Sequence, residues 1–341
     1  MPLVPQNRDH PLTEELGHLL EQASSFEAEL DFVRAIETLT SANRLRRDVD
    51  VERRLLRLRR DAFARAGADA PRLASSRPRA SVPIDPAARL PAVPVERLTA
   101  EVARSAIDAH GSLIVRGLFD GDTAAKLRGS IDAAFAARGA APDPSTRGSG
   151  WYEALDVPGA DRDFVASDGV LAADSPRGFF DMLDAFSGAG MSNIVGEFFG
   201  EPAALSFEKT TLRRVEPGVS GSWHQDGAFL GVQVRSLNVW VALSRCGDDA
   251  PSLEVVQRRI PRIVPTGFYF DWDVADSTIA REFPGLVPAA PRFEAGDAML
   301  FDHFCLHRTA RRPDMLHSRY AIESWFFAPS AFPVGYTGLS V

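Results

Sequence analysis

The sequence predicts a mainly β core of the jelly-roll or barrel class, preceded by a helical N-terminal extension. The first part of the chain carries apolar side chains at three- and four-residue steps, as one buried helix face would. From residue 201 onward, short strand candidates alternate with turn signals and no helical period dominates. The length of 341 residues suits one large domain or a core with a smaller module.

The N-terminal extension is expected over residues 1–66, with helices near residues 12–30, 32–43 and 51–66. The third helix alternates leucines with many arginines, and such alternation is typical of a solvated helix face. We interpret this segment as structural or as an interaction element. The first helix is indicated by its apolar positions: Leu16, Leu19, Leu20, Ala23, Phe26 and Leu30.

Residues 67–97 are expected to form a linker or an extended strap, because they are rich in alanine, proline, serine and arginine. Proline at this density blocks helix and sheet interiors. The remaining residues, 98–341, are then expected to form the main domain. Its first half predicts helices at residues 100–109, 121–138, 177–186 and 191–199, and a strand at 112–116. Strands are expected at residues 204–215, 236–244, 252–256, 298–302 and 320–327.

The bulk composition excludes several classes of protein. The net charge of -8 gives no basic footprint for nucleic acid, and no apolar run is long enough to cross a bilayer. The N-terminus lacks the apolar segment of a secretory signal. The two cysteines, Cys246 and Cys305, do not form a disulfide framework. We therefore expect a cytoplasmic protein without a nucleic-acid or membrane partner. The oligomeric state is not indicated.

The first chemical motif is Trp223-His224-Gln225-Asp226. If this segment is a strand, side chains two residues apart share a face, so His224 and Asp226 converge while Gln225 points away. An imidazole and a carboxylate together suit a divalent metal of borderline softness. An isolated triplet of this kind is more often a hydrogen-bonded surface pair.

The second motif, GDAMLFDHFCLH, leads from a turn through an apolar strand to His303 and His307. In an unbroken strand these two histidines share a face, so their spacing does not choose between them. Arg319 follows twelve residues after His307, and its planar fork matches a carboxylate. The order His-x-Asp, distal His, Arg is more specific than any one part. It fits the facial triad of non-haem iron(II) oxygenases.

With these motifs in place, the sequence resembles the phytanoyl-CoA dioxygenase-like family over about residues 109–327. The resemblance rests on HGSLIVRGLFDGDTAAKL, SWHQDGAFLG, GDAMLFDHFCLHRTA and the arginine of SRYAIESWFF. It implies a double-stranded β-helix, which is a cupin-like jelly roll, with helices packed around it. One departure is the stretch SLEVVQRR at residues 252–259, where the family often has Pro-Gly-Ser-His. The substrate is therefore expected to differ from phytanoyl-CoA.

The resemblance also implies the site. It selects His307 as the distal ligand, because Thr309 follows it at two residues. Iron(II) is then held by His224, Asp226 and His307. The cosubstrate 2-oxoglutarate is held at its far carboxylate by Arg319 and Thr309, and Lys209 is a further candidate contact. With O2, the implied reaction is hydroxylation of an unactivated C–H bond with release of succinate and CO2. Candidate substrate contacts are Trp223, Phe229, Trp151, Tyr152 and Asn238.

Other outcomes remain open from the sequence. The same chemistry also supports desaturation or cyclisation, whereas halogenation needs a vacancy where Asp226 stands. A different class is a non-catalytic jelly-roll protein that acts through its helical N-terminus. A third is a cupin-type metalloenzyme that does not use 2-oxoglutarate, and it gives Arg319 and Thr309 no role.

Overall fold

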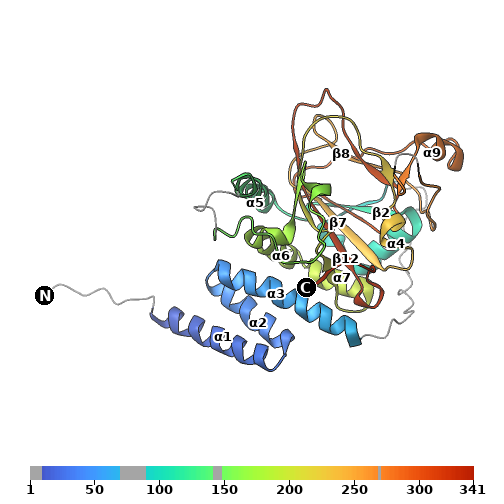
Figure 1. Ribbon diagram of the computed structural model, residues 1–341. Coiled ribbons are helices and arrows are strands. Elements are labelled where there is room, and N and C mark those ends of the chain that lie inside the picture. Colours follow the sequence, from blue (N-terminus) through green and yellow to red (C-terminus); the bar gives the residue numbers. More distant parts are fainter. Residues whose placement is uncertain (1–9, 70–89, 141–147, 268–269) are drawn as a thin grey trace.

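The structure is a computed structural model, and it describes residues 10–69, 90–140, 148–267 and 270–341. Helices gather in the first half of the described chain and strands in the second (Figure 1). The helices are α1 (His10–Ala28), α2 (Phe32–Leu45), α3 (Val49–Asp69), α4 (Ala100–His110), α5 (Gly121–Gly139), α6 (Pro176–Gly188), α7 (Met191–Phe199), α8 (Gly227–Leu230) and α9 (Asp276–Glu282). None of these described helices is both long and apolar enough to cross a membrane.

The strands form two sheets. The larger has the order β1-β2-β10-β7-β12-β4-β13, with β5 paired to β12 and β3 to β5, and the smaller has the order β8-β11-β6-β9. The strands are β1 (Ala92–Pro94), β2 (Ser112–Arg116), β3 (Gly169–Leu171), β4 (Ala204–Ser206), β5 (Thr211–Val215), β6 (Trp223–His224), β7 (Ser236–Ala242), β8 (Ser252–Val255), β9 (Asp273–Val274), β10 (Ala298–Phe301), β11 (His307–Ala310), β12 (Arg319–Phe327) and β13 (Gly338–Ser340).

From β5 to β12 the strands alternate between the two sheets, except that β9 follows β8 in the smaller sheet. The chain passes from β5 in the larger sheet to β6 in the smaller, to β7 in the larger, to β8 and β9 in the smaller, and then to β10, β11 and β12 in alternation. Residues that are close in sequence, such as those at the end of β10 and the start of β11, therefore lie on different sheets.

Both faces of the larger sheet are buried, and the two-residue period of its strands separates two cores. Trp240, Met299 and Trp325 point to one face and pack in a cluster with residues of β8. Their neighbours Val239 and Leu300 point to the other face, where α4, α5, α6 and α7 supply much of the packing. The helices thus cover the outside of the larger sheet, and its inside faces the smaller sheet.

The N-terminal helices pack directly on this body, as α3 beside α6 shows (Figure 1). Leu39 of α2 and Leu55 of α3 are fully buried in the same core cluster as the outer face of the sheet. The Arg59 guanidinium donates a hydrogen bond of 2.7 Å to the backbone carbonyl of Ser340 in β13. The extension therefore packs into the same core as the part of the chain that it precedes in sequence.

Several expected elements have different bounds in the structure. The strand expected over residues 204–215 is two strands, β4 and β5, separated by a turn at residues 207–210. The short helices α8 and α9 were not expected. Most of the expected linker, residues 70–89, lies outside the described residues, and β1 at its end pairs parallel with β2. The division at residues 66 and 97 stays a prediction.

Candidate metal centre

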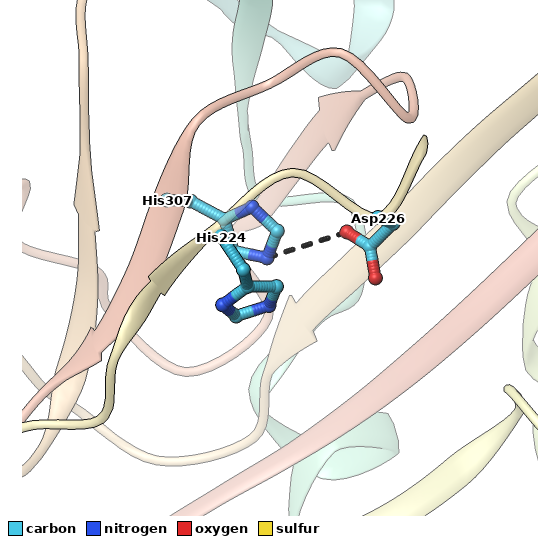
Figure 2. A group of neighbouring side chains, drawn as sticks. All are labelled: His224, Asp226 and His307. Carbon is cyan, nitrogen blue, oxygen red and sulfur yellow. Dashed lines mark ion pairs between the residues drawn. The ribbon is translucent and has the colours of Figure 1, made fainter. Parts of the chain in front are cut away.

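Two histidines are placed opposite each other by the smaller sheet. His224 ends β6 and His307 begins β11, and the two residues are direct partners in the antiparallel pairing of these strands. Asp226 lies at the start of α8 with a helical backbone (φ -61°, ψ -24°). The expectation that His224 and Asp226 share a strand face is therefore wrong. The chain turns after His224, and this turn brings the carboxylate to the histidine pair (Figure 2).

The three side chains form a compact donor set. One candidate ligand atom from each of His224, Asp226 and His307 lies within 4.8 Å of the others, and these three are the group of this kind found in the described part of the chain. Asp226 Oδ2 lies 3.7 Å from His307 Nε2, which is the contact drawn in Figure 2.

Backbone carbonyls fix which ring nitrogen each histidine presents. His224 Nδ1 lies 3.0 Å from the carbonyl of Ser222, and His307 Nδ1 lies 3.0 Å from the carbonyl of Cys305. A carbonyl oxygen only accepts, so both Nδ1 atoms donate and both Nε2 atoms keep a free lone pair. Such second contacts orient metal-binding histidines in proteins.

The buried carboxylate of Asp226 has an oxygen available to bind a cation. Asp226 is 4% exposed, and its Oδ2 has no hydrogen-bond partner among the described residues. An unpartnered buried carboxylate oxygen is costly unless a cation or donor meets it. Burial and the charge of His307 lower the pKa of His224, which favours the neutral imidazole that binds metals.

Gln225 and His303 point elsewhere. The Gln225 amide donates to the carbonyls of Arg262 and Phe304 at 3.0 and 2.7 Å, and so ties two loops together behind the site. His303 Nδ1 lies 2.8 Å from the Ser236 hydroxyl, away from the donor set. Because β10 ends at Phe301 and β11 begins at His307, the chain changes sheets between the two histidines. The crossover places His307, and not His303, beside His224 and Asp226.

A cavity of about 660 Å³ opens in front of the donor set and is lined by residues of both sheets. Arg319 and Thr309 line it together with His224, Asp226 and His307. Arg319 is 2% exposed, and its guanidinium makes one long hydrogen bond, 3.4 Å to the carbonyl of Ser252. Its Nε has no partner among the described residues, and burial lowers its pKa to about 10. A buried guanidinium with so few acceptors is suited to a carboxylate ligand.

The remaining candidate contacts, for cosubstrate or substrate, separate into two groups. Lys209 and Phe229 line the cavity, and the Lys209 ammonium lies 4.3 Å from the centre of the Phe229 ring. Lys209 occupies the turn between β4 and β5 and not a strand as expected. The other four are not among the cavity-lining residues: Trp223, Trp151, Tyr152 and Asn238.

The reasons differ for these four residues. The Trp223 indole is buried in a separate cluster, where it donates 2.8 Å to Asp276. Trp151 and Tyr152 follow Gly150, whose Cα lies against Val49 of α3, so they are close to the N-terminal helices. Asn238 faces the inside of the sheet between Phe301 and Trp325, where it is fully buried.

Glu323 also lines the cavity, and the sequence analysis missed it. It lies four residues after Arg319 on β12, and the two-residue period of a strand places both on the same face. That parity was readable from the sequence. The same cavity is lined by aromatic side chains that sequence reasoning did not single out as site residues, Phe164 and Tyr336.

No family model matches the chain, and no curated protein matches its sequence. Among solved structures, the chain is similar to EctD from S. alaskensis with 2-oxoglutarate and 5-hydroxyectoine. The identity is 18% and the TM-score 0.49, over 69% of this chain and 77% of that chain. It is also similar to the epimerase SnoN in complex with Fe3+, alpha ketoglutarate and nogalamycin RO. That identity is 15% and the TM-score 0.47, over 67% of this chain and 83% of that chain. Similarities of this size do not establish a function for this chain.

Proposed function

We propose that this chain is an iron(II)- and 2-oxoglutarate-dependent oxygenase, whose metal is held by His224, Asp226 and His307. The observation that carries the proposal is the donor set. Two imidazoles with their Nδ1 atoms committed to carbonyls meet a buried carboxylate with a free oxygen. Two histidines and one carboxylate, with the remaining positions open to a cavity, are typical of non-haem iron(II) oxygenases.

The cosubstrate is supported by a second feature of the same cavity. Thr309 lies on β11 of the smaller sheet and Arg319 on β12 of the larger, and both line the cavity that contains the donor set. We assign the far carboxylate of 2-oxoglutarate to the Arg319 fork, with the Thr309 hydroxyl as a second donor. A metalloenzyme that does not use 2-oxoglutarate leaves the Arg319 guanidinium buried and nearly unpartnered.

The chain's own residues then divide the work. With O2 and 2-oxoglutarate, bound iron supplies the oxidising chemistry that releases succinate and CO2 and oxidises a C–H bond. His224, Asp226 and His307 fix the metal, and Asp226 offsets part of its charge. Arg319 and Thr309 orient the cosubstrate. Phe301 and Trp240 line the cavity as apolar walls that exclude water from this end. Hydroxylation is our first expectation for a small-molecule substrate, with desaturation or cyclisation as alternatives.

The fold and family proposals follow from the same observations. The alternation of strands between two sheets is what a double-stranded β-helix requires, and we assign residues 98–341 to that fold. We propose the phytanoyl-CoA dioxygenase-like family on the sequence motifs alone. The cytoplasmic location stays a prediction.

The test is iron-dependent release of succinate from 2-oxoglutarate by the purified chain. We expect one iron(II) per chain and slow succinate release without added substrate, which stops when a chelator is present. A chain that binds no iron, or that binds iron and never releases succinate at saturating 2-oxoglutarate, would contradict the proposal.

A further inference from the structure

Glu323 places a carboxylate on the inner face of the larger sheet. The other residues of β12 on this face are apolar, except Arg319, which we assign to the cosubstrate. Thr211 Oγ1 donates to it at 3.2 Å, and it forms no ion pair within 4.0 Å among the described residues. Burial raises the pKa of Glu323, but nearby positive charges, first Arg213 and also Lys209, act in the opposite direction and hold it below its usual value. Among the described residues the carboxylate has one hydrogen-bond donor, Thr211, and a carboxylate accepts several.

Lys209 is a cation that likewise lacks a partner of opposite charge among the described residues. Its ammonium lies over the rings of Phe164, Phe229 and Tyr336 at 4.7, 4.3 and 5.8 Å. No hydrogen bond or ion pair to Lys209 is formed by the described residues, and burial lowers its pKa. A cation in an aromatic cage is attracted to the ring faces, but these faces do not neutralise its charge. An anionic group is the ligand that this position lacks.

Three other charged side chains of the cavity, outside the donor set and Arg319, already have partners. Arg213 pairs with Asp168 at 3.0 Å, and Glu208 accepts from the backbone N–H of Thr337 at 2.9 Å. Asp161 accepts from the backbone N–H of Asp163 at 2.9 Å. Glu323 and Lys209 therefore stand apart from the structural ion pairs of this region.

The strand register separates this pair from the cosubstrate position. Arg319 is opposite Val215 and Glu323 is opposite Thr211 in the β12–β5 pairing, while Lys209 precedes Thr211 by two residues. At about 3.3 Å per residue, Glu323 lies roughly 13 Å along the strand from Arg319. Lys209 lies in the turn before Thr211, which is the cross-strand partner of Glu323. Arg319 and the Glu323–Lys209 pair thus occupy opposite parts of the cavity.

We propose that the substrate is a small dipolar molecule of the amino-acid type, whose cationic nitrogen is received by Glu323 and whose carboxylate is received by Lys209. This inference rests on the proposed function and names the substrate class of that same site. It replaces the expectation that Lys209 contacts the cosubstrate. Glu323 and Lys209 carry opposite charges, line the same cavity and are not paired with other side chains. Together they are complementary to a ligand that carries both a positive and a negative charge.

The size and walls of the cavity agree with such a ligand. A volume of about 660 Å³ has to contain 2-oxoglutarate as well as the substrate, which limits the substrate to a small molecule. Phe229 and Trp272 line the cavity on the side of the metal ligands, and their rings lie 6.4 Å apart edge to face. These rings offer apolar surface to the carbon skeleton between the two charged groups.

The experiment is a screen of the iron-loaded chain with 2-oxoglutarate for compounds that accelerate succinate release. The probes are amino acids and N-methylated betaines, compared with amines and carboxylates of matched carbon skeleton. We expect acceleration by members of the dipolar set, and loss of at least about tenfold in apparent affinity when either end is blocked as an amide or ester. Acceleration by a singly charged or neutral set instead, or none by the dipolar set, would overturn the substrate class.

Variants of the two residues give the second readout. Glu323→Gln and Lys209→Met are each expected to raise the half-saturating concentration of the accelerating probe by about 10- to 100-fold, the cost of one charged contact. The 2-oxoglutarate requirement is expected to stay unchanged in both. Glu254→Gln is the matched control. Glu254 follows the cavity residue Leu253 on β8, so its side chain points to the other face of that strand, where it pairs with Arg308 at 2.7 Å.

The two proposals fail in different ways. Without any probe, the wild type and the Glu254→Gln control are expected to bind iron and release succinate slowly. If the wild type lacks this basal release, the proposed function itself is wrong. If basal release is present but Lys209→Met raises the 2-oxoglutarate requirement and leaves the probe requirement unchanged, Lys209 serves the cosubstrate and the substrate assignment is overturned.

Discussion

His224 and His307 are direct cross-strand partners, and their ring centres lie 4.4 Å apart. The pairing of β6 with β11 sets this relationship, so the metal geometry is a property of strand register. Asp226 joins the pair from the turn that follows β6. The position of the site therefore depends on backbone hydrogen bonding between two short strands as much as on the three side chains.

Removal of either histidine is expected to abolish tight iron binding. His224→Ala or His307→Ala leaves two of three protein ligands and removes an imidazole whose orientation the backbone already fixes. The measurement is iron(II) content per chain after anaerobic loading and desalting, with succinate release as the second readout. His303→Ala is the control, because His303 is bonded to Ser236 outside the donor set. Loss of iron in His303→Ala with retention in His307→Ala would reverse the assignment of the distal ligand.

The sequence indicated which side chains lie together, but not the geometry that brings them together. The order of the motifs was sufficient to propose His224, Asp226 and Arg319, whereas the choice of His307 over His303 came from the family resemblance. The reason given for the first pair was incorrect, since Asp226 lies in a helical turn and not on a strand. A strand of two residues has too short a pattern to be delimited by alternation.

The fold shows the same division. The strand at Ser112–Arg116 and the helix at Met191–Phe199 have the bounds that their apolar patterns predicted. By contrast, the crossover between β10 and β11 depends on contacts far apart in sequence, such as the Arg259–Asp302 ion pair at 2.7 Å. The packing of α3 on β13 also joins residues far apart in sequence, so the periodicity of α3 alone could not predict it.

The N-terminal helices are expected to stabilise the whole chain. Leu39 of α2 is fully buried in the main core cluster, so Leu39→Ala is expected to cost about 2–5 kcal/mol in unfolding free energy. Val33 lies on the same helix and is 66% exposed, and Val33→Ala is expected to change stability by less than about 0.5 kcal/mol. Thermal unfolding of both variants measures the difference. Deletion of residues 1–66 is then expected to destabilise the catalytic domain, and an equally stable truncated protein would show that the helices are an independent unit.

Gly296 precedes β10 and is expected to tolerate no side chain. Its φ is +95°, and a Cβ there would lie 2.0 Å from the carbonyl oxygen of Phe119. Gly296→Ala combines backbone strain with a clash, and we expect a loss of about 3 kcal/mol or more. Gly117 has a φ of +67° and open space around it, so Gly117→Ala isolates the strain at about 1 kcal/mol. Equal unfolding midpoints for the two variants would show that the close approach to Phe119 is absent.

Arg319 distinguishes a 2-oxoglutarate enzyme from other metalloproteins of similar architecture. Its guanidinium is buried in the cavity, and its one hydrogen bond, to Ser252, is long at 3.4 Å. Loss of one partner of a buried charged pair costs about 2–5 kcal/mol, which is a roughly 30- to 5,000-fold weaker affinity for the cosubstrate. Arg319→Ala is therefore expected to raise the 2-oxoglutarate requirement within that range, while iron binding persists.

Two further variants sharpen the Arg319 test. Arg319→Lys is expected to restore only part of the affinity, because lysine keeps the charge and loses the planar fork. Arg308→Ala is the control, since Arg308 precedes Thr309 on β11 and pairs with Glu254 at 2.7 Å outside the cavity. A titration of succinate release with 2-oxoglutarate compares all of these with the wild type. An unchanged requirement in Arg319→Ala, or an equal rise in Arg308→Ala, would remove Arg319 from the cosubstrate site, because a specific carboxylate contact predicts a rise for Arg319 alone.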